Sequence, residues 1–135
     1  MKILVLLGPN LNMVGIRKKE VYGEENAVSI NNRICEFAAK KGIECDVFQS
    51  NHEGVLIDKI HETLDLYDGV VINPGALTHY SYALRDAIEC VAEIPFVEVH
   101  MSDISKREDF RKISVTAEVC RKQIMGYGVD SYFMG

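Results

Sequence analysis

The chain has 135 residues, a formal net charge of −5, and 47% hydrophobic and 26% charged residues. This length fits a single domain over residues 1–135, with a composition ordinary for a globular protein. The negative charge argues against non-specific nucleic-acid binding, and no apolar run reaches the roughly 20 residues of a membrane span, so neither partner is expected.

The N-terminal part of the chain predicts a buried strand, a long loop and a helix. Residues 3–7 are a continuous apolar run, too short for a signal peptide and typical of a strand buried on both faces. Turn-forming residues dominate from 8 to 25, and so long a loop in a compact domain is usually functional. Apolar residues at helical spacing then predict a helix that Asn26 or Ser29 caps and Gly42 stops.

The middle of the chain predicts a strand, a helix and another strand. Residues 43–48 alternate between apolar and polar, as in a half-buried strand. Apolar residues recur at helical spacing from Val55 to Tyr67. Residues 69–72 form an apolar third strand, which the turn sequence at 73–75 ends.

The C-terminal part continues this alternation. It predicts a helix from about 80 to 91 and a fourth strand over 95–99. Ser105 is expected to cap a short helix that runs through Arg111. The last twenty residues are ambiguous and favour a strand near 119–125, followed by a short helix.

Strands that alternate with helices predict βαβ units and a parallel sheet. Right-handed crossovers place the helices on both faces of such a sheet. Five strands in a chain of this size predict an α/β fold, namely a flavodoxin-like, doubly wound, five-stranded parallel sheet.

The four cysteines show no C-x-x-C pair and no spacing typical of a zinc site. Cys35 and Cys90 fall in apolar helical patterns, and Cys45 falls in a strand pattern. We expect all four, including Cys120, to be reduced and mostly buried, with no bound metal and a cytoplasmic location.

Polar side chains follow three of the predicted strands, at the ends where doubly wound sheets bind their ligands. The chain has neither G-x-G-x-x-G after its first strand nor G-x-x-x-x-G-K-[ST], so we expect no nucleotide or flavin cofactor. The polar residues at the strand ends are Asn10, Asn12, Arg17 and Tyr22, then Asn73, Thr78 and His79, and finally His100, Ser102 and Asp103.

These groups suit the removal of a proton from a carbon acid. A tyrosine has a pKa of roughly 10, and a nearby guanidinium, such as Arg17 beside Tyr22, lowers it by stabilising the phenolate. An asparagine can hold a water or an oxyanion, and a histidine can donate a proton near neutral pH. Taken singly, each is more often a structural residue, so the residues alone indicate a small-molecule enzyme or binder.

Basic residues cluster at 17–19, at 106–107 and at 111–112. Such clusters in an acidic protein can bind a small anion. For the lysines, a solvated surface position is the more ordinary interpretation.

Seven short segments occur in an order and spacing that resembles a known family. They are GPNLN (8–12), Gly15 with Arg17 and Tyr22-Gly23, QSNHEG (49–54), NPGALTH (73–79), ALRDA (83–87), EVHMS (98–102) and REDFR (107–111). Together they resemble the type II 3-dehydroquinate dehydratases over residues 3 to about 114.

The resemblance implies a lyase that reversibly removes water, in anti geometry, from 3-dehydroquinate to give 3-dehydroshikimate. This is a step of the shikimate or quinate pathway, towards aromatic amino acids, and it needs neither cofactor nor metal. Tyr22 would be the base that forms an enolate, held as phenolate by Arg17. Asn10 would position a water beside the enolate oxygen. His100, oriented by Glu98, would protonate the leaving hydroxyl.

The resemblance also implies how the substrate is bound. Asn73 and the backbone amides of Met101 and Ser102 would hold its carboxylate, while His79 and Arg111 would contact its ring hydroxyls. The loop at 8–25 would close over it as a lid.

The family's assembly, a trimer that packs into a dodecamer, implies that Asp86 reaches the site of a neighbouring subunit. Some residues depart from the family pattern. Lys18-Lys19 replace the usual Glu-Pro, and beyond Ser114 the match weakens, with Glu118 in place of a proline and Arg121-Lys122 in place of small or apolar residues. Lys18-Lys19 bear on the lid and on how it binds anions, and the departures beyond Ser114 bear on the edge strand and on assembly.

Two other functions compete with the dehydratase. One is a non-catalytic flavodoxin-like module that binds a small carboxylate or a protein. The other is a nucleotide- or flavin-binding protein, against which the missing phosphate loop counts.

Overall fold

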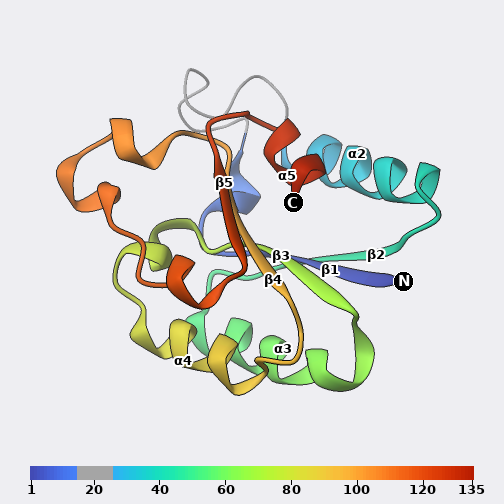
Figure 1. Ribbon diagram of the computed structural model, residues 1–135. Coiled ribbons are helices and arrows are strands. Elements are labelled where there is room, and N and C mark those ends of the chain that lie inside the picture. Colours follow the sequence, from blue (N-terminus) through green and yellow to red (C-terminus); the bar gives the residue numbers. More distant parts are fainter. Residues whose placement is uncertain (15–25) are drawn as a thin grey trace.

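Five parallel strands form a twisted sheet in the computed structural model, which describes residues 1–14 and 26–135 (Figure 1). The strands lie in the order β2-β1-β3-β4-β5, which confirms the doubly wound α/β fold. Their bounds are β1 (Lys2–Leu7), β2 (Glu44–Gln49), β3 (Gly69–Asn73), β4 (Phe96–His100) and β5 (Lys122–Met125).

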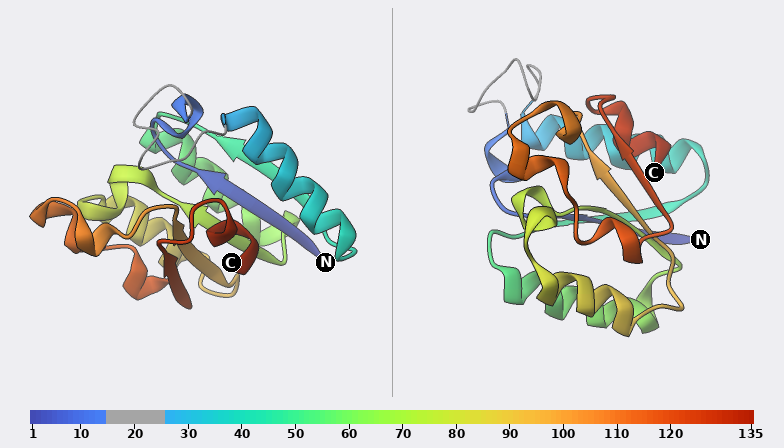
Figure 2. Two further views of the ribbon diagram at one scale, coloured as in Figure 1. Left: turned by 90° about the horizontal axis from the view of Figure 1, so that it is seen from above. Right: turned by 60° about the vertical axis from the view of Figure 1, so that its left-hand side comes forward.

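Helices cover both faces of the sheet, as Figures 1 and 2 show. One face carries α2 (Ala27–Lys40) and α5 (Asp130–Met134), and the other carries α3 (Glu53–Leu66) and α4 (Tyr82–Cys90). Because side chains alternate along a strand, the apolar runs supply both cores.

The helix starts follow from short-range capping. The side-chain oxygen of Asn26 accepts a hydrogen bond from the backbone N–H of Ser29 at 2.8 Å, so Asn26, rather than the alternative Ser29, caps α2. Gly42 has a φ of +73° directly after this helix. Ser81 caps α4 through Leu84 and also donates to Glu53 on α3, at 2.5 Å. This hydroxyl therefore ties together the two helices of one face.

The connection between β4 and β5 differs from the prediction. It contains the 3-10 turns η3 (Ile104–Lys106), η4 (Asp109–Lys112) and η5 (Ala117–Val119) rather than one short helix. Asp103 is the cap, because its carboxylate accepts from the backbone N–H of Ser105 at 3.0 Å. The segment has no apolar stripe to hold a continuous helix against the sheet.

The expectation of mostly buried cysteines is wrong, because two of the four are exposed and the other two are only partly buried. All four are free thiols, but Cys35 and Cys90 are exposed because they lie on helix flanks, beside the buried stripes. Burial raises the pKa of Cys45 to about 11 and that of Cys120 to about 12, so both are neutral thiols. None of the helices in the described part of the chain has the length and apolar character that crossing a membrane requires.

The ends of β1 and β3 approach closely at one glycine. A side chain at Gly8 would place its Cβ 2.4 Å from the carbonyl oxygen of Pro74. The backbone N–H of Gly8 donates to the carbonyl of Asn73 at 2.8 Å. This contact sets how far apart the loops after the two strands lie.

We predict that Gly8→Ala lowers the free energy of unfolding by about 1–3 kcal/mol, because the clash is with backbone that cannot rotate away. Chemical denaturation measures this change. Gly54→Ala, in α3 with open space around it, is the matched control and should be neutral or up to about 1 kcal/mol more stable. Equal stability of the two variants would contradict the close approach.

Candidate active site

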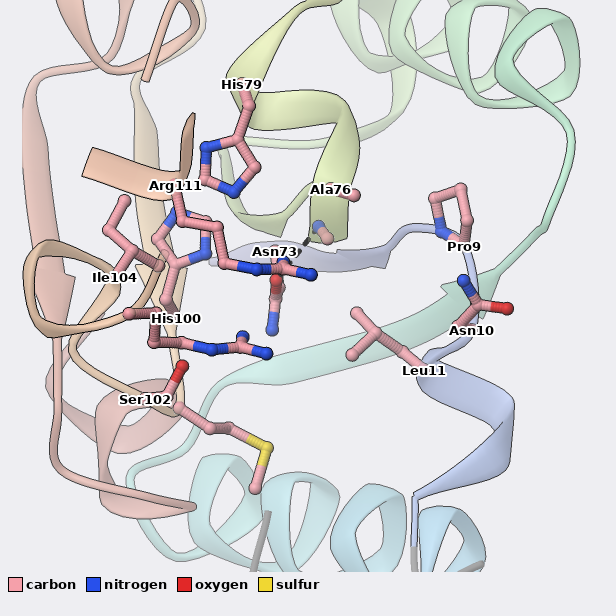
Figure 3. A pocket seen from close by; sticks show the side chains of 13 residues that line it. Pro9, Asn10, Leu11, Asn73, Ala76, His79, His100, Ser102, Ile104 and Arg111 are labelled. Carbon is pink, nitrogen blue, oxygen red and sulfur yellow. Dashed lines mark hydrogen bonds between the residues drawn. The ribbon is translucent and has the colours of Figure 1, made fainter. Parts of the chain in front are cut away.

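The carboxyl ends of β1, β3 and β4 enclose a pocket of about 100 Å³ (Figure 3). Three connections supply its walls: the turn after β1, the 3-10 turn η2 (Gly75–His79) after β3, and the η3–η4 segment after β4. It is lined by Pro9, Asn10, Leu11, Asn73, Gly75, Ala76, His79, His100, Met101, Ser102, Ile104, Arg107 and Arg111.

Asn10 is held in a conformation that few side chains tolerate. Its φ is +70°, in the left-handed region that asparagine adopts more readily than most residues. Its backbone N–H donates to the side-chain oxygen of Asn51 at 2.9 Å. Gln49 donates to the same oxygen and to the carbonyl of Gly8, both at 3.1 Å. The polar turn after β2 therefore fixes the turn after β1.

Asn73, at the end of β3, is buried and held at both ends of its amide. Its oxygen accepts from the backbone N–H of Gly75 at 3.1 Å, and its nitrogen donates to the hydroxyl of Tyr132 at 2.9 Å. An amide nitrogen carries two hydrogens, and no other described residue accepts the second. Asn73 thus has one donor left for a ligand in the pocket.

His79 presents a fixed tautomer. Its Nδ1 lies 2.8 Å from the carbonyl of Ile113, which can only accept, so Nδ1 carries the hydrogen and Nε2 is the acceptor of the neutral ring. Burial, followed by the charge of Arg111, lowers the pKa of His79. The ring also meets the edge of Phe110, with centroids 5.7 Å apart. Near neutral pH this histidine is an uncharged hydrogen-bonding group.

Glu98 and His100 form a buried acid–base pair. They are two residues apart on β4 and therefore share one face of the strand. The imidazole Nε2 donates to Glu98 Oε2 at 3.0 Å, so Nδ1 is the ring nitrogen available to a ligand. Burial acts to raise the pKa of Glu98, but hydrogen bonds from His100, Thr116 and Gln123 together lower it. Glu98 is therefore a carboxylate that holds the His100 ring through Nε2.

The predicted basic clusters divide between pocket and solvent. Arg107 and Arg111 line the pocket, whereas the side chains of Lys106 and Lys112 are 81% and 54% exposed. The Arg111 guanidinium lies 4.7 Å from the ring centroid of Phe110, and its Nε donates to Glu108. The arginines therefore supply positive charge to the pocket, and the solvated interpretation is confirmed for Lys106 and Lys112, whereas the cluster at 17–19 lies outside the described residues.

The structure brings most of the predicted site residues together. His100 and six other predicted site residues line the pocket, and Glu98 lies behind His100, to which it is hydrogen-bonded. Arg17 and Tyr22 lie outside the described residues. Asp86 is exposed on α4 and does not line the pocket of its own chain. The six are Asn10, Asn73, His79, Met101, Ser102 and Arg111.

Sequence reasoning missed two residues of the site. The sequence shows Arg107 only as part of a basic cluster and a motif, and it gives Tyr132 no link to the site. The arginine spacing 107 and 111 was the available signal for the first. Nothing local in the sequence links Tyr132 to Asn73, because their contact spans 59 residues. Among the described residues, no group of three or more His, Cys, Asp or Glu side chains is arranged to bind a metal.

The model of the family described as dehydroquinase class II matches residues 1–135. The chain belongs to this family. It is 55% identical to the 3-dehydroquinate dehydratase of Thermotoga maritima over 99% of its own length and 91% of that protein. It is 53% identical to the 3-dehydroquinate dehydratase of Lachnospira eligens, with 98% and 90% coverage.

Solved structures agree with this assignment. The type II dehydroquinase of Butyrivibrio crossotus superposes with a TM-score of 0.98 at 55% identity, over 99% of this chain and 93% of that one. The type II dehydroquinase of Propionibacterium acnes gives a TM-score of 0.93 at 36% identity, over 98% and 91%. The fold and the order of the strand-end loops are therefore those of the family.

We predict that Tyr132→Phe lowers the free energy of unfolding by about 1–3 kcal/mol, because it removes the acceptor of a buried amide donor. Thermal or urea denaturation measures the change. Tyr127→Phe is the matched control, since Tyr127 is 59% exposed and lies in the same C-terminal segment. A loss no larger than that of the control would show that the Asn73 contact carries no stability.

Glu98 also makes the stability depend on pH. Its pKa in the folded protein lies below the ordinary 4.5, so unfolding takes up protons in acid. The stabilisation that ionised Glu98 gives the folded state is complete above pH 4.5. It disappears as the pH falls through the pKa of Glu98 in the folded protein. We predict that the free energy of unfolding falls less steeply in acid for Glu98→Gln than for the wild type. Urea denaturation at a series of pH values measures this. Glu36→Gln, at an exposed site on α2, should keep the wild-type pH dependence.

Proposed function

We propose that this chain, as one catalytic domain over residues 1–135, is a type II 3-dehydroquinate dehydratase of the shikimate or quinate pathway. It removes water reversibly from 3-dehydroquinate to give 3-dehydroshikimate. The observation that carries the proposal is the Glu98–His100 pair, which faces a pocket that also holds Asn73 and Arg111. An acid and an anion-binding set thus share one pocket, in a chain whose relatives carry this name.

The first step is removal of the proton next to the ketone. The assigned base is Tyr22, and Arg17 holds it as phenolate by placing a positive charge beside it. The electron pair of the broken C–H bond moves to the ketone oxygen and forms an enolate. Asn10 supports that oxygen through a bound water. This part rests on the family motif.

The second step is loss of the hydroxyl on the adjacent carbon. The enolate electrons form the new C=C bond, the C–O bond breaks, and His100 Nδ1 donates its proton to the departing oxygen. The balance is one proton to the base, one from the acid, and one water released. Glu98 supports this step because it stabilises the imidazolium before transfer and fixes which nitrogen faces the substrate.

Binding of the anionic substrate follows from the donors in the pocket. The second amide hydrogen of Asn73 and the backbone of Met101 and Ser102 are assigned to its carboxylate. Neutral His79 and the Arg111 guanidinium are assigned to its hydroxyls. The chain as a whole is acidic, so the attraction is local.

Arg107 adds a second cation to the pocket beside Arg111. Glu98 is buried and paired with the imidazole, so it is a partner of neither arginine, whereas Glu108 pairs with the Nε of Arg111.

Assembly completes the proposal. Asp86 lies on the exposed side of α4 and is assigned to the site of a neighbouring subunit, in a trimer that packs into a dodecamer in the cytoplasm. Four large apolar side chains on η2, α4 and the η4 region are exposed, which supports a subunit contact there. They are Tyr80, Tyr82, Phe110 and Ile113.

The test is conversion of 3-dehydroquinate by the purified protein with a chelator present and no cofactor added. The product is a conjugated enone carboxylate, so its formation is followed by ultraviolet absorbance. We predict conversion by the wild type and a loss of at least about 1,000-fold in kcat for Tyr22→Phe, since the change removes only the reacting hydroxyl. Tyr127→Phe should keep the wild-type rate.

Each result is decisive. Near-normal turnover by a folded Tyr22→Phe variant would show that the base is wrong. No product from a folded wild-type protein that still binds the substrate would support the non-catalytic carboxylate-binding module instead.

A further inference from the structure

The carboxylate of Glu98 is fully buried, and hydrogen-bond donors surround both of its oxygens. Thr116 donates to Oε1, and Gln123 donates to Oε2 at 2.8 Å. The hydroxyl of Ser114 lies 3.1 Å from Oε1 and 2.9 Å from Oε2. His100 shares Oε2 with Gln123. The donors come from β4, from the turn before β5 and from β5 itself.

A second group of contacts fixes these donors. The hydroxyl of Thr78 lies 2.6 Å from that of Ser114 and 2.8 Å from that of Thr116. The carbonyl of Thr78 accepts from the backbone N–H of Val115 at 2.7 Å. Thr78 and Thr116 are both fully buried. The 114–116 segment is therefore held between η2 and Glu98, and its hydroxyls have little freedom to turn away.

A carboxylate without such partners would take up a proton when buried. The pKa of Glu98 is nevertheless lowered, although burial is the largest influence and acts to raise it. The donors must therefore outweigh the loss of water. A neutral Glu98 would no longer offset the charge of a protonated His100.

We propose that Thr116, Ser114 and Gln123 are positioning residues that act on the reaction through Glu98, by keeping its carboxylate charged and fixed against the His100 ring. The inference rests on the proposed function, because it concerns the proton that His100 donates. It assigns to the turn before β5, and to β5, a role in catalysis without contact to the substrate.

Several other ionisable groups lie near Glu98 and His100. His79 has a lowered pKa, through burial first and Arg111 second. Cys120 has its pKa raised to about 12, by burial first and by the charge of Glu98 second. Arg107 and Arg111 are cations throughout. His79, Cys120 and the two arginines therefore each keep one charge state near and above neutral pH.

The test variants are Thr116→Val, which keeps the shape of the side chain, and Gln123→Met, which keeps its length. The direct measurement is the NMR titration of the His100 ring in the substrate-free protein. The chain has four histidines, and His100→Asn assigns the signal. We expect the His100 pKa to fall by about 0.5 to 1 unit in each variant, since a carboxylate that has lost one donor is held less firmly against the ring and supports the imidazolium less.

The rate provides a second readout. We expect kcat to fall about tenfold at the optimum, with the alkaline limb of the profile moved to lower pH by the same shift. Thr116→Ser restores a hydroxyl and should recover both values. Thr63→Val is the matched control, because Thr63 is also fully buried but donates to the carbonyl of Ile60 within α3. It should change neither value.

The possible results separate the two proposals. An unchanged or raised His100 pKa in Thr116→Val and Gln123→Met, with an active wild type, would overturn the positioning role alone. A wild type that makes no product would overturn the function, while the titration would still decide whether the donors act on the pair. Should Thr116→Val fail to fold, Gln123→Met, at a partly exposed position on β5, carries the test.

Discussion

A buried negative charge at the centre of β4 sets the conditions for the rest of the site. Glu98 has no exposed surface, so its charge depends wholly on protein donors. Those donors define the path of the chain after β4: the 114–116 segment must return to Glu98, and β5 must present Gln123 to it. The fold around β4 and β5 is thus shaped by a polar network as much as by apolar packing.

This requirement explains the connection between β4 and β5. A regular crossover would use a helix with an apolar stripe, but such a helix would not bring hydroxyls back to the strand. The chain instead makes short 3-10 turns, drawn in orange in Figure 1. One end of this connection places Arg107 and Arg111 in the pocket, and the other supplies Ser114 and Thr116 to Glu98. The arginines that line the pocket and the hydroxyls that donate to Glu98 therefore belong to one segment.

The elements with strong apolar periodicity were predictable because their signal is local. The first four strands and the polar residues at the strand ends follow from patterns within a few residues, whereas the pattern left β5 ambiguous and the cap of α2 open between Asn26 and Ser29. The family motifs then gave the set of pocket residues. The Asn73–Tyr132 contact was not predictable in this way, because its partners lie 59 residues apart. The Asp103 cap is local, but Ser105, two residues further on, has the same capping chemistry and was the wrong choice. Helical spacing alone also does not show which residues are buried, since Val55 has the expected spacing and yet is exposed.

The two sides of the pocket are held by different physical means, and they should respond differently to change. On the β1 side, backbone geometry dominates: Gly8 packs against Pro74, and Asn10 keeps a left-handed conformation. Steric constraints of this kind are independent of pH. On the β4 side, the geometry follows the ionisation of Glu98 and weakens when that carboxylate takes up a proton. Acid should therefore disturb the wall that carries His100 before it disturbs the wall that carries Asn10.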